Sequence, residues 1–301
     1  MQMSYHNPVL LHESVNALAI KKDGIYVDVT FGGGGHSKEI LNQLGENGKL
    51  FAFDQDADAL QNKIDDERFV LIAENFRFIS RFLRFYGIKK VDGILADLGV
   101  SSHQFDEASR GFSTRFDGDL DMRMNQKSKI SAKYVINKYP EEKLSDILFL
   151  YGELRNAKSI AKTIVEERQK EKIDTSFQLK KVLENYLPKS KEHKILAQIY
   201  QAFRIEVNEE LEALKEFLSQ TPNLLNDNGR LSVISYHSLE DRLVKRFINS
   251  GMFSGELEKD MFGNTNEPFK KVGKLIVPSN AEIKQNNRAR SAKLRIATLK
   301  K

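Results

Sequence analysis

The sequence predicts an α/β protein with a doubly wound, mostly parallel sheet and an all-α segment inserted into it. Short apolar runs alternate with helical patterns through the first hundred residues, which is typical of repeated β-α-β units. This alternation stops at Leu98, helical patterns follow from Ser131 to Asn208, and a strand-like run returns at Arg230–Tyr236. A glycine cluster after the first strand indicates a ligand site at the carboxyl end of the sheet.

The first expected strand, Ile25–Phe31, leads into the glycine run Gly32–Gly35 and a predicted helix over Lys38–Leu44. A strand, a glycine turn and a helix together bring backbone N–H groups close to a ligand. The next strand, Leu50–Phe53, ends at Asp54. This carboxylate lies about 20 residues beyond the turn, where such folds bind ribose hydroxyls. The sequence therefore predicts a cofactor that contains a nucleoside.

The glycine pattern narrows the choice of cofactor. The dinucleotide fingerprint G-x-G-x-x-G is met at Gly32 and Gly34 but fails at Ser37, and no phosphate-binding G-x-x-x-x-G-K-[ST] is present. S-adenosyl-L-methionine fits better, because it carries a ribose and no phosphate. A turn with no ligand is the alternative that the glycines alone leave open.

The remaining elements of the α/β part follow from apolar periodicity. Further strands are expected at Phe69–Ile72, Val91–Asp97, Arg230–Tyr236, Leu275–Val277 and Leu294–Leu299. Helices are expected at Val15–Ile20, Asp58–Lys63, Ile79–Phe85, Glu209–Ser219 and Leu239–Phe247, the last with Ser238 as N-cap. The segment Gly251–Val272 is polar and is predicted to be a loop.

The insertion begins with a polar segment, Ser109–Asn125, that we expect to be an ordered loop. Helices are then predicted at Ala132–Lys138, Glu141–Tyr151, Asn156–Lys170, Ser176–Leu187 and Lys194–Val207. We therefore expect two domains, a discontinuous one over 1–108 and 209–301 and an inserted helical one over 109–208 that recognises the substrate.

Charge is unevenly distributed along the chain. The net charge is +5, and the segment from Lys270 to Lys301 contains ten Lys or Arg and one Glu, a net of +9, so the other residues carry −4. A basic tail on a mildly acidic body predicts a polyanionic partner, most simply nucleic acid. A solvated, partly disordered end is the alternative.

Composition excludes several classes of chemistry. The chain has no cysteine, which excludes disulfides, Cys-ligated zinc, iron–sulfur clusters and a cysteine nucleophile. No apolar run approaches the roughly 18 residues of a membrane span, and the N-terminus lacks a signal pattern, so a cytoplasmic protein without membrane association is expected. The histidines match no standard metal-site spacing, and no metal is expected.

Two polar motifs follow predicted strands and are candidates for chemistry. Asp97-Leu98-Gly99-Val100-Ser101-Ser102 follows the fourth strand, and Tyr236-His237-Ser238-Leu239-Glu240-Asp241 follows the fifth. Asp97 at a strand tip is suited to accept hydrogen bonds from an amine, although a capping role is the alternative. A hydrolase is disfavoured because no G-x-S-x-G elbow is present.

The motifs taken together resemble the ribosomal RNA small-subunit methyltransferase H family. The matching segments are Val27–Ser37, Ile94–Ser102, Arg110–Ser113, Leu120–Met124, Tyr236–Arg242 and Asn287–Ser291. The resemblance implies a class I S-adenosyl-L-methionine-dependent methyltransferase that methylates the exocyclic N4 of a cytosine in the decoding region of 16S rRNA, within the small ribosomal subunit. One departure is Gly33, where some members have Arg.

The resemblance also implies functional residues. The expected cofactor contacts are Gly34, Gly35, His36, Asp54, Phe76, Asp97 and Gln104. The catalytic candidates by position are Asp97, Ser101 and Ser102. Substrate contacts are expected from Arg110, Phe112, Arg123, Tyr236, His237, Arg288 and Arg290. In the loop, Arg110, Arg115 and Arg123 are interleaved with Phe112 and Phe116, a mixture that suits phosphate contacts and base stacking, and Arg288 and Arg290 belong to the basic tail. The alternative for the two loop phenylalanines is that they anchor the loop to the core. A non-catalytic RNA-binding or assembly protein with a vestigial cofactor site is the alternative.

Overall fold

A computed structural model describes residues 8–256 and 267–300, which divide into two compact units. The first unit lies within Met1–Gly99 and Leu211–Lys301, and the second is Val100–Glu210. The second boundary lies two residues beyond the one expected at 208/209, but the first lies nine residues before the one expected at 108/109, so residues 100–108 belong to the helical unit. None of the described helices is both long and apolar enough to cross a bilayer.

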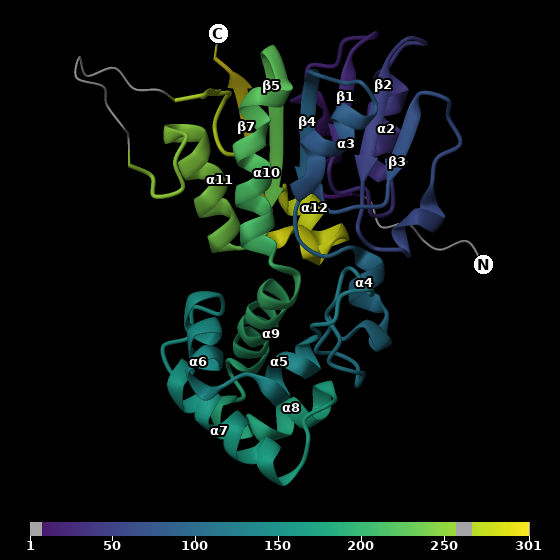
Figure 1. The fold of residues 1–301 in the computed structure, drawn as a ribbon. Helices are drawn as coiled ribbons and strands as arrows, with labels where there is room; N and C mark the ends of the chain where they lie inside the picture. The colour runs from purple at the N-terminus through teal and green to yellow at the C-terminus, as the bar shows by residue number, and fades with distance from the viewer. Residues whose placement is uncertain (1–7, 257–266, 301) are drawn as a thin grey trace. The chain divides into compact units, whose positions relative to one another are not determined.

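The first unit is built on a seven-stranded sheet in the order β3-β2-β1-β4-β5-β7-β6 (Figure 1). The five strands β3 to β5 of this order run parallel, and β7 pairs antiparallel with both β5 and β6. The strands are β1 Ile25–Asp28, β2 Lys49–Phe53, β3 Phe69–Ile72, β4 Val91–Asp97, β5 Leu225–Ser235, β6 Phe269–Lys271 and β7 Lys293–Leu299. The predicted mostly parallel sheet is confirmed.

Helices bury both faces of this sheet, as the nearly continuous apolar strands require. Val27 and Ile94 face the side covered by α3 (Ile79–Phe85), α10 (Glu210–Leu224) and α11 (Ser238–Ser250). Tyr26 and Leu95, one residue along each strand, face α1 (Leu11–Asn16) and α2 (Gly35–Gln43). The unit also contains the short 3₁₀ helices η1 (Ala59–Asn62) and η2 (Phe76–Phe78).

The basic tail is part of the fold. After β6 it forms α12 (Asn280–Gln285), the 3₁₀ helix η5 (Asn287–Ser291) and β7. Ala289, Leu294 and Ile296 pack in a core cluster with Val9 and Leu10 from the start of the described chain. Leu294 and Ile296 therefore anchor the tail, whereas the apolar side chains of Leu275 and Val277 are exposed.

The second unit is helical and has its own core. Its elements are α4 Ser102–Asp106, η3 Ala108–Arg110, α5 Ala132–Lys138, α6 Glu141–Leu150, α7 Ala157–Lys170, α8 Ser176–Val182, η4 Glu184–Tyr186 and α9 Glu192–Asn208. The core includes Ile136, Leu148, Ile164 and Phe203, all buried. Side-chain caps begin several of these helices; Ser131, for example, accepts from Tyr134 N–H at the start of α5.

Several expected elements differ from the structure. The first strand ends at Asp28, because Val29–Phe31 already turn toward the glycines. The expected helix at Val15–Ile20 lies earlier, as α1. The segment Asp58–Lys63 forms only the 3₁₀ helix η1. Ser238 is the first residue of α11, and its N-cap is His237.

The C-terminal predictions also need correction. Leu275–Val277 does not form a strand and makes a single bridge, between Ile276 and Leu294. The antiparallel partner at the edge of the sheet is instead β6, which lies within the segment expected to be a loop. Both β6 and α12 are too short to show periodicity.

Candidate active site at the carboxyl ends of the strands

The glycine loop between β1 and α2 is built for close approach of backbone. Gly34, the N-cap of α2, has φ +77, and a Cβ there would lie 2.9 Å from the Phe31 ring. A Cβ on Gly35 would lie 2.1 Å from Cγ of Pro8. Since Gly34 provides no capping side chain, the first-turn N–H groups of α2 are left for a ligand.

Asp54, at the end of β2, holds the glycine loop. Its Oδ2 accepts from Gly32 N–H at 2.8 Å and its Oδ1 from Asp56 N–H at 2.9 Å. Burial raises the Asp54 pKa to about 6, and the two N–H donors oppose that rise. Each carboxylate oxygen has a second lone pair, so the group can still accept from ribose hydroxyls.

Asp97, at the end of β4, lies between residues from two neighbouring strand tips. The Tyr236 hydroxyl, after β5, donates to Asp97 Oδ1 at 2.7 Å. Nδ1 of His36, on α2, lies 3.8 Å from Asp97 Oδ2. Burial raises the Asp97 pKa to about 6, while His36 and the Tyr236 hydrogen bond oppose the rise. The structure thus brings three of the predicted residues together.

Below this group, polar contacts tie β1 to β4 and α2. Asp97 N–H donates to Thr30 Oγ1 at 2.6 Å. The fully buried Asp28 accepts from Thr30 N–H and from the Ser37 hydroxyl, the latter at 2.7 Å. These hydrogen bonds fix the backbone at Asp97 to the segment after β1, and that segment to α2.

Glu240 is a residue that the sequence reasoning did not assign. Its Oε2 accepts from Tyr236 N–H at 2.9 Å, and its Oε1 lies 3.1 Å from His237 Nε2. Glu240 is buried in the first turn of α11 and so sets the turn that carries Tyr236. The available signal was the acidic residue three positions after His237, as in a capping box.

Phe76 lies beyond the end of β3, as expected of a residue at the cofactor edge. It begins η2, and its ring packs edge-on against Phe217 with centroids 5.4 Å apart. Asn75 accepts from Arg77 N–H and fixes this turn. Contact between Phe76 and a cofactor stays a prediction.

Ser101, Ser102 and Gln104 belong to the second unit and form the start of α4. Ser101 Oγ accepts from Gln104 N–H, while Gln104 Oε1 accepts from Ser101 N–H at 3.0 Å. This reciprocal capping box gives the Ser101 hydroxyl a structural role, and it uses one of the hydrogen-bonding atoms of the buried Gln104 side chain. Catalytic roles for the serines and a cofactor contact for Gln104 remain predictions.

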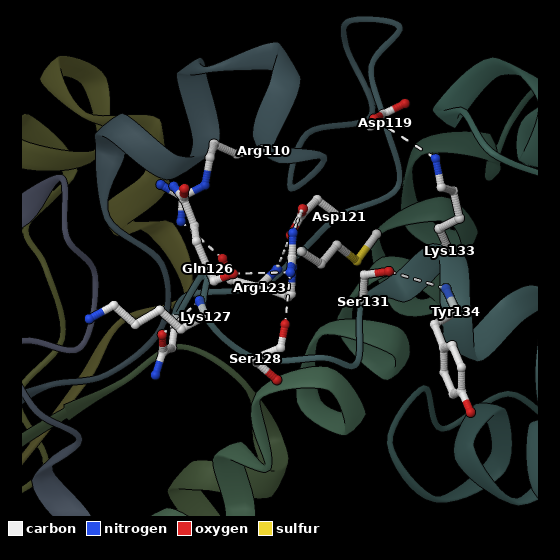
Figure 2. A network of polar contacts seen from close by, with 12 residues as sticks. Arg110, Asp119, Asp121, Arg123, Gln126, Lys127, Ser128, Ser131, Lys133 and Tyr134 are labelled. Carbon is white, nitrogen blue, oxygen red and sulfur yellow. Dashed lines mark hydrogen bonds and ion pairs between the residues drawn. The ribbon is translucent and has the colours of Figure 1, made fainter.

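The loop after α4 is held together by its own arginines (Figure 2). Arg123 forms a two-pronged ion pair with Asp121 and donates to the Gln126 and Ser128 carbonyls. Arg110 is buried and donates to the Arg123 carbonyl at 2.9 Å.

Phe112, between these arginines, is only 5% exposed and packs in the core of the second unit. Its ring therefore anchors the loop and has no free face for base stacking. The ring of Phe116, four residues further on, is 49% exposed.

The basic residues of the tail fall into two groups. Lys293 and Arg295 on β7 both contact the Asp241 carboxylate of α11 and so support the fold. Arg288 is half-buried in η5, whereas Arg290 is exposed. Of the two tail arginines expected to bind substrate, Arg290 is thus the more accessible.

Comparison with known proteins gives a nearly full-length match. The model of the MraW methylase family matches residues 3–300. A protein of Christiangramia forsetii named ribosomal RNA small subunit methyltransferase H is 68% identical over 295 residues, 98% of each chain. One of the same name from Cytophaga hutchinsonii is 58% identical and covers 97% of this chain and 99% of its own.

Solved structures give a weaker likeness. An rRNA methylase from Streptococcus thermophilus covers 99% of both chains at 13% identity, with a TM-score of 0.44. We draw no conclusion from this structural likeness, and the family is assigned from the sequence matches alone.

Proposed function

This chain belongs to the MraW methylase family, and we propose that it methylates the exocyclic N4 of a cytosine in the decoding region of 16S rRNA. Membership in the family confirms the predicted family resemblance, the class I methyltransferase fold and S-adenosyl-L-methionine as the cofactor. Its relatives are named as methyltransferases of small-subunit ribosomal RNA, which supports that RNA as the substrate.

The residues at the strand tips fit this cofactor. A Cβ on Gly34 or Gly35 would collide with Phe31 or Pro8, so only glycine allows this tight turn at the start of α2, and Asp54 offers carboxylate oxygens to ribose hydroxyls. S-adenosyl-L-methionine supplies a methyl group on a sulfonium, which needs only a positioned nucleophile. Gly34, Gly35 and His36 are the residues that we assign to the loop contacts.

The observation that carries the N4 assignment is the oriented Asp97 carboxylate. The lone pair of a cytosine amine is delocalised into its ring, so an acceptor beside the amine must favour its pyramidal form. Asp97 accepts from one N4–H, and as the new N–C bond forms and the sulfonium C–S bond breaks, the carboxylate takes that proton.

The neighbours of Asp97 prepare it for this role. The Tyr236 pKa is raised well above its usual value by burial and by the Asp97 charge, so the phenol stays protonated and donates to the carboxylate. With a pKa of about 6, Asp97 is mostly ionised at neutral pH. Positioning and electrostatics of this kind supply most of the acceleration.

Transfer of a labelled methyl group to small-subunit RNA, followed by nucleoside mass spectrometry, tests the proposal. We expect N4-methylcytidine at one position, and Asp97→Asn should lower kcat, measured at saturating cofactor because Asp97 is also an expected cofactor contact, by about 10²–10⁴-fold. A methyl group on carbon or on another base would contradict the N4 assignment. Absence of any transfer would favour the non-catalytic alternative.

A further inference from the structure

Two exposed phenylalanine rings are held in neighbouring segments of the second unit. Phe116 is 49% exposed and Phe177, on α8, is 53% exposed. The residues are about sixty positions apart in sequence, but Phe177 N–H donates to the carboxylate of Asp117 at 3.0 Å. Neither ring has a ring or cation partner in the described parts of the chain. Both rings are thus exposed to solvent on segments that a hydrogen bond links.

The backbone beneath the two rings is fixed. Ser176 N–H donates to the Gly118 carbonyl at 3.0 Å, and Asp119 pairs with Thr175 through an antiparallel bridge. A Cβ on Gly118 would lie 2.0 Å from the Ala108 carbonyl oxygen. The rings therefore project from a well-ordered junction, which lowers the entropy lost when a ligand binds.

The surroundings of the rings favour nucleic acid over protein. Between Ser109 and Lys133 the chain has six Lys or Arg and three Asp. The three acids are engaged: Asp121 pairs with Arg123, Asp119 lies 3.9 Å from Lys133, and Asp117 accepts from Phe177 N–H. Since Arg123 and Lys133 are in these pairs and Arg110 is buried, the other cations of the segment are Arg115, Lys127 and Lys129. Figure 2 shows the first two of these pairs, and the Lys127 side chain pointing away from them.

A cation also accompanies Phe177 on its own helix. Lys181 is four residues further along α8, hence on the same side as Phe177, and it is exposed. Polar residues flank both rings in sequence, namely Arg115, Asp117, Ser176 and Gln178. A protein interface needs a larger continuous apolar patch, whereas base stacking needs only a ring face and a nearby positive charge.

We propose that Phe116 and Phe177 form a stacking platform for unpaired nucleobases of the RNA substrate, with Lys181 pairing with an adjacent phosphate. This rests on the proposed function for the identity of the RNA. Of the two loop rings from which base stacking is expected, it keeps Phe116, leaves out the buried Phe112 and adds Phe177. The chemistry that recognises the ligand is the π-face of any base, so the platform binds single-stranded RNA with little sequence preference.

The double variant Phe116→Ala/Phe177→Ala tests the platform in the full-length protein. Loss of base stacking should raise KM for small-subunit RNA by about tenfold to a hundredfold, with kcat and cofactor affinity nearly unchanged. Phe116→Trp/Phe177→Trp should restore binding, because Trp keeps a stacking face. Lys181→Ala should lower the slope of log K against log salt by about one.

A matched control removes comparable exposed apolar surface elsewhere in the same unit. Phe149 and Leu150, at the end of α6, are 60% and 56% exposed, and Phe149→Ala/Leu150→Ala should leave KM unchanged. An equal KM in the two double variants would overturn the platform, as would failure of the Trp variant to recover binding.

The two proposals fail in distinguishable ways. Fluorescence titration with a single-stranded oligoribonucleotide measures the platform without requiring methyl transfer. If the wild type transfers no methyl group but the Phe variant still binds this probe more weakly than the control, only the proposed function fails. If transfer proceeds normally in the Phe variant, only the platform fails.

Discussion

Asp54 combines two tasks in one side chain, because the carboxylate that we assign to the ribose also holds Gly32 N–H. Asp54→Ala should therefore lose hydrogen bonds worth about 1–3 kcal/mol and weaken cofactor binding about tenfold or more. Calorimetric titration with S-adenosyl-L-methionine measures the change. Asp58→Ala, in the loop that follows, serves as a control for removal of a nearby carboxylate, and equal affinities in the two variants would exclude Asp54 from the site.

If Asp97 takes the N4 proton as proposed, methyl transfer should depend on pH. A carboxylate whose pKa is raised to about 6 is protonated below that value and cannot take the N4 proton, so kcat at saturating cofactor should rise with pH through about 6 and then level off. Since the Tyr236 hydrogen bond lowers the Asp97 pKa, Tyr236→Phe should move the midpoint to higher pH. An unchanged midpoint in this variant would show that Tyr236 does not influence the group that takes the proton.

The raised pKa values affect stability in the opposite direction: they lower the free energy of unfolding as pH rises. The folded-state values of Asp54 and Asp97, about 6 for each, lie above the usual carboxylate value, so each group favours folding most below pH about 4 and loses that contribution as pH rises through about 6. Burying these two carboxylates at the strand tips therefore costs stability at neutral pH, where both are mostly ionised. Such a cost in stability is expected at a functional site.

At the scale of the element, β7 and η5 divide the basic tail between folding and binding. Arg295 forms a two-pronged ion pair with Asp241, so Arg295→Ala should lower the free energy of unfolding by about 1–3 kcal/mol. Arg290 is exposed, and Arg290→Ala should leave stability unchanged while it reduces the salt dependence of RNA binding. Thermal unfolding and salt titration separate the two effects. A loss of stability in Arg290→Ala would place that residue in the fold.

Elements with a complete local signal could be predicted from the sequence. The helix over Ala132–Lys138 matches α5 because Ser131 caps its start and Pro140 follows its end. Strands β2, β3 and β4 are short, mostly apolar runs, and an acidic residue ends β4 or follows β2 and β3 within two positions. By contrast, β6 has three residues and gains its identity only by pairing with β7, so no local pattern could show it.

The candidate site also has features that the sequence could predict and features that it could not. Asp97 and Tyr236 were visible as polar residues after strands, because strand ends in a parallel sheet share one edge. Their hydrogen bond, and the place of Glu240 beneath Tyr236, depend on side-chain directions that spacing does not give. The burial of Phe112 and the exposure of Phe116 likewise depend on how the loop packs on helices far along the chain.

At the scale of the whole molecule, most of the residues that we assign to the cofactor and the two exposed rings that we assign to RNA lie on different compact units. Gly34, Asp54, Asp97 and Tyr236 belong to the first unit, whose cores are formed without the second. The second unit, Val100–Glu210, has a separate core and carries Phe116 and Phe177. We therefore propose that the first unit alone holds the cofactor and that the helical unit recognises RNA.

Replacing residues 100–210 with a Gly-Ser linker tests this division. The shortened protein should bind S-adenosyl-L-methionine with an affinity within about tenfold of the full chain, because Gln104 is the one predicted cofactor contact that it loses. It should not methylate small-subunit RNA, since the stacking rings and the cationic loop are gone. Calorimetry measures the first property and label transfer the second, with the same replacement carrying Asp54→Ala as a control for specific cofactor binding. Methyl transfer at a near-normal rate by the shortened protein would show that the helical unit is dispensable, and the RNA contacts would then have to lie on the first unit, beginning with Arg290 on η5.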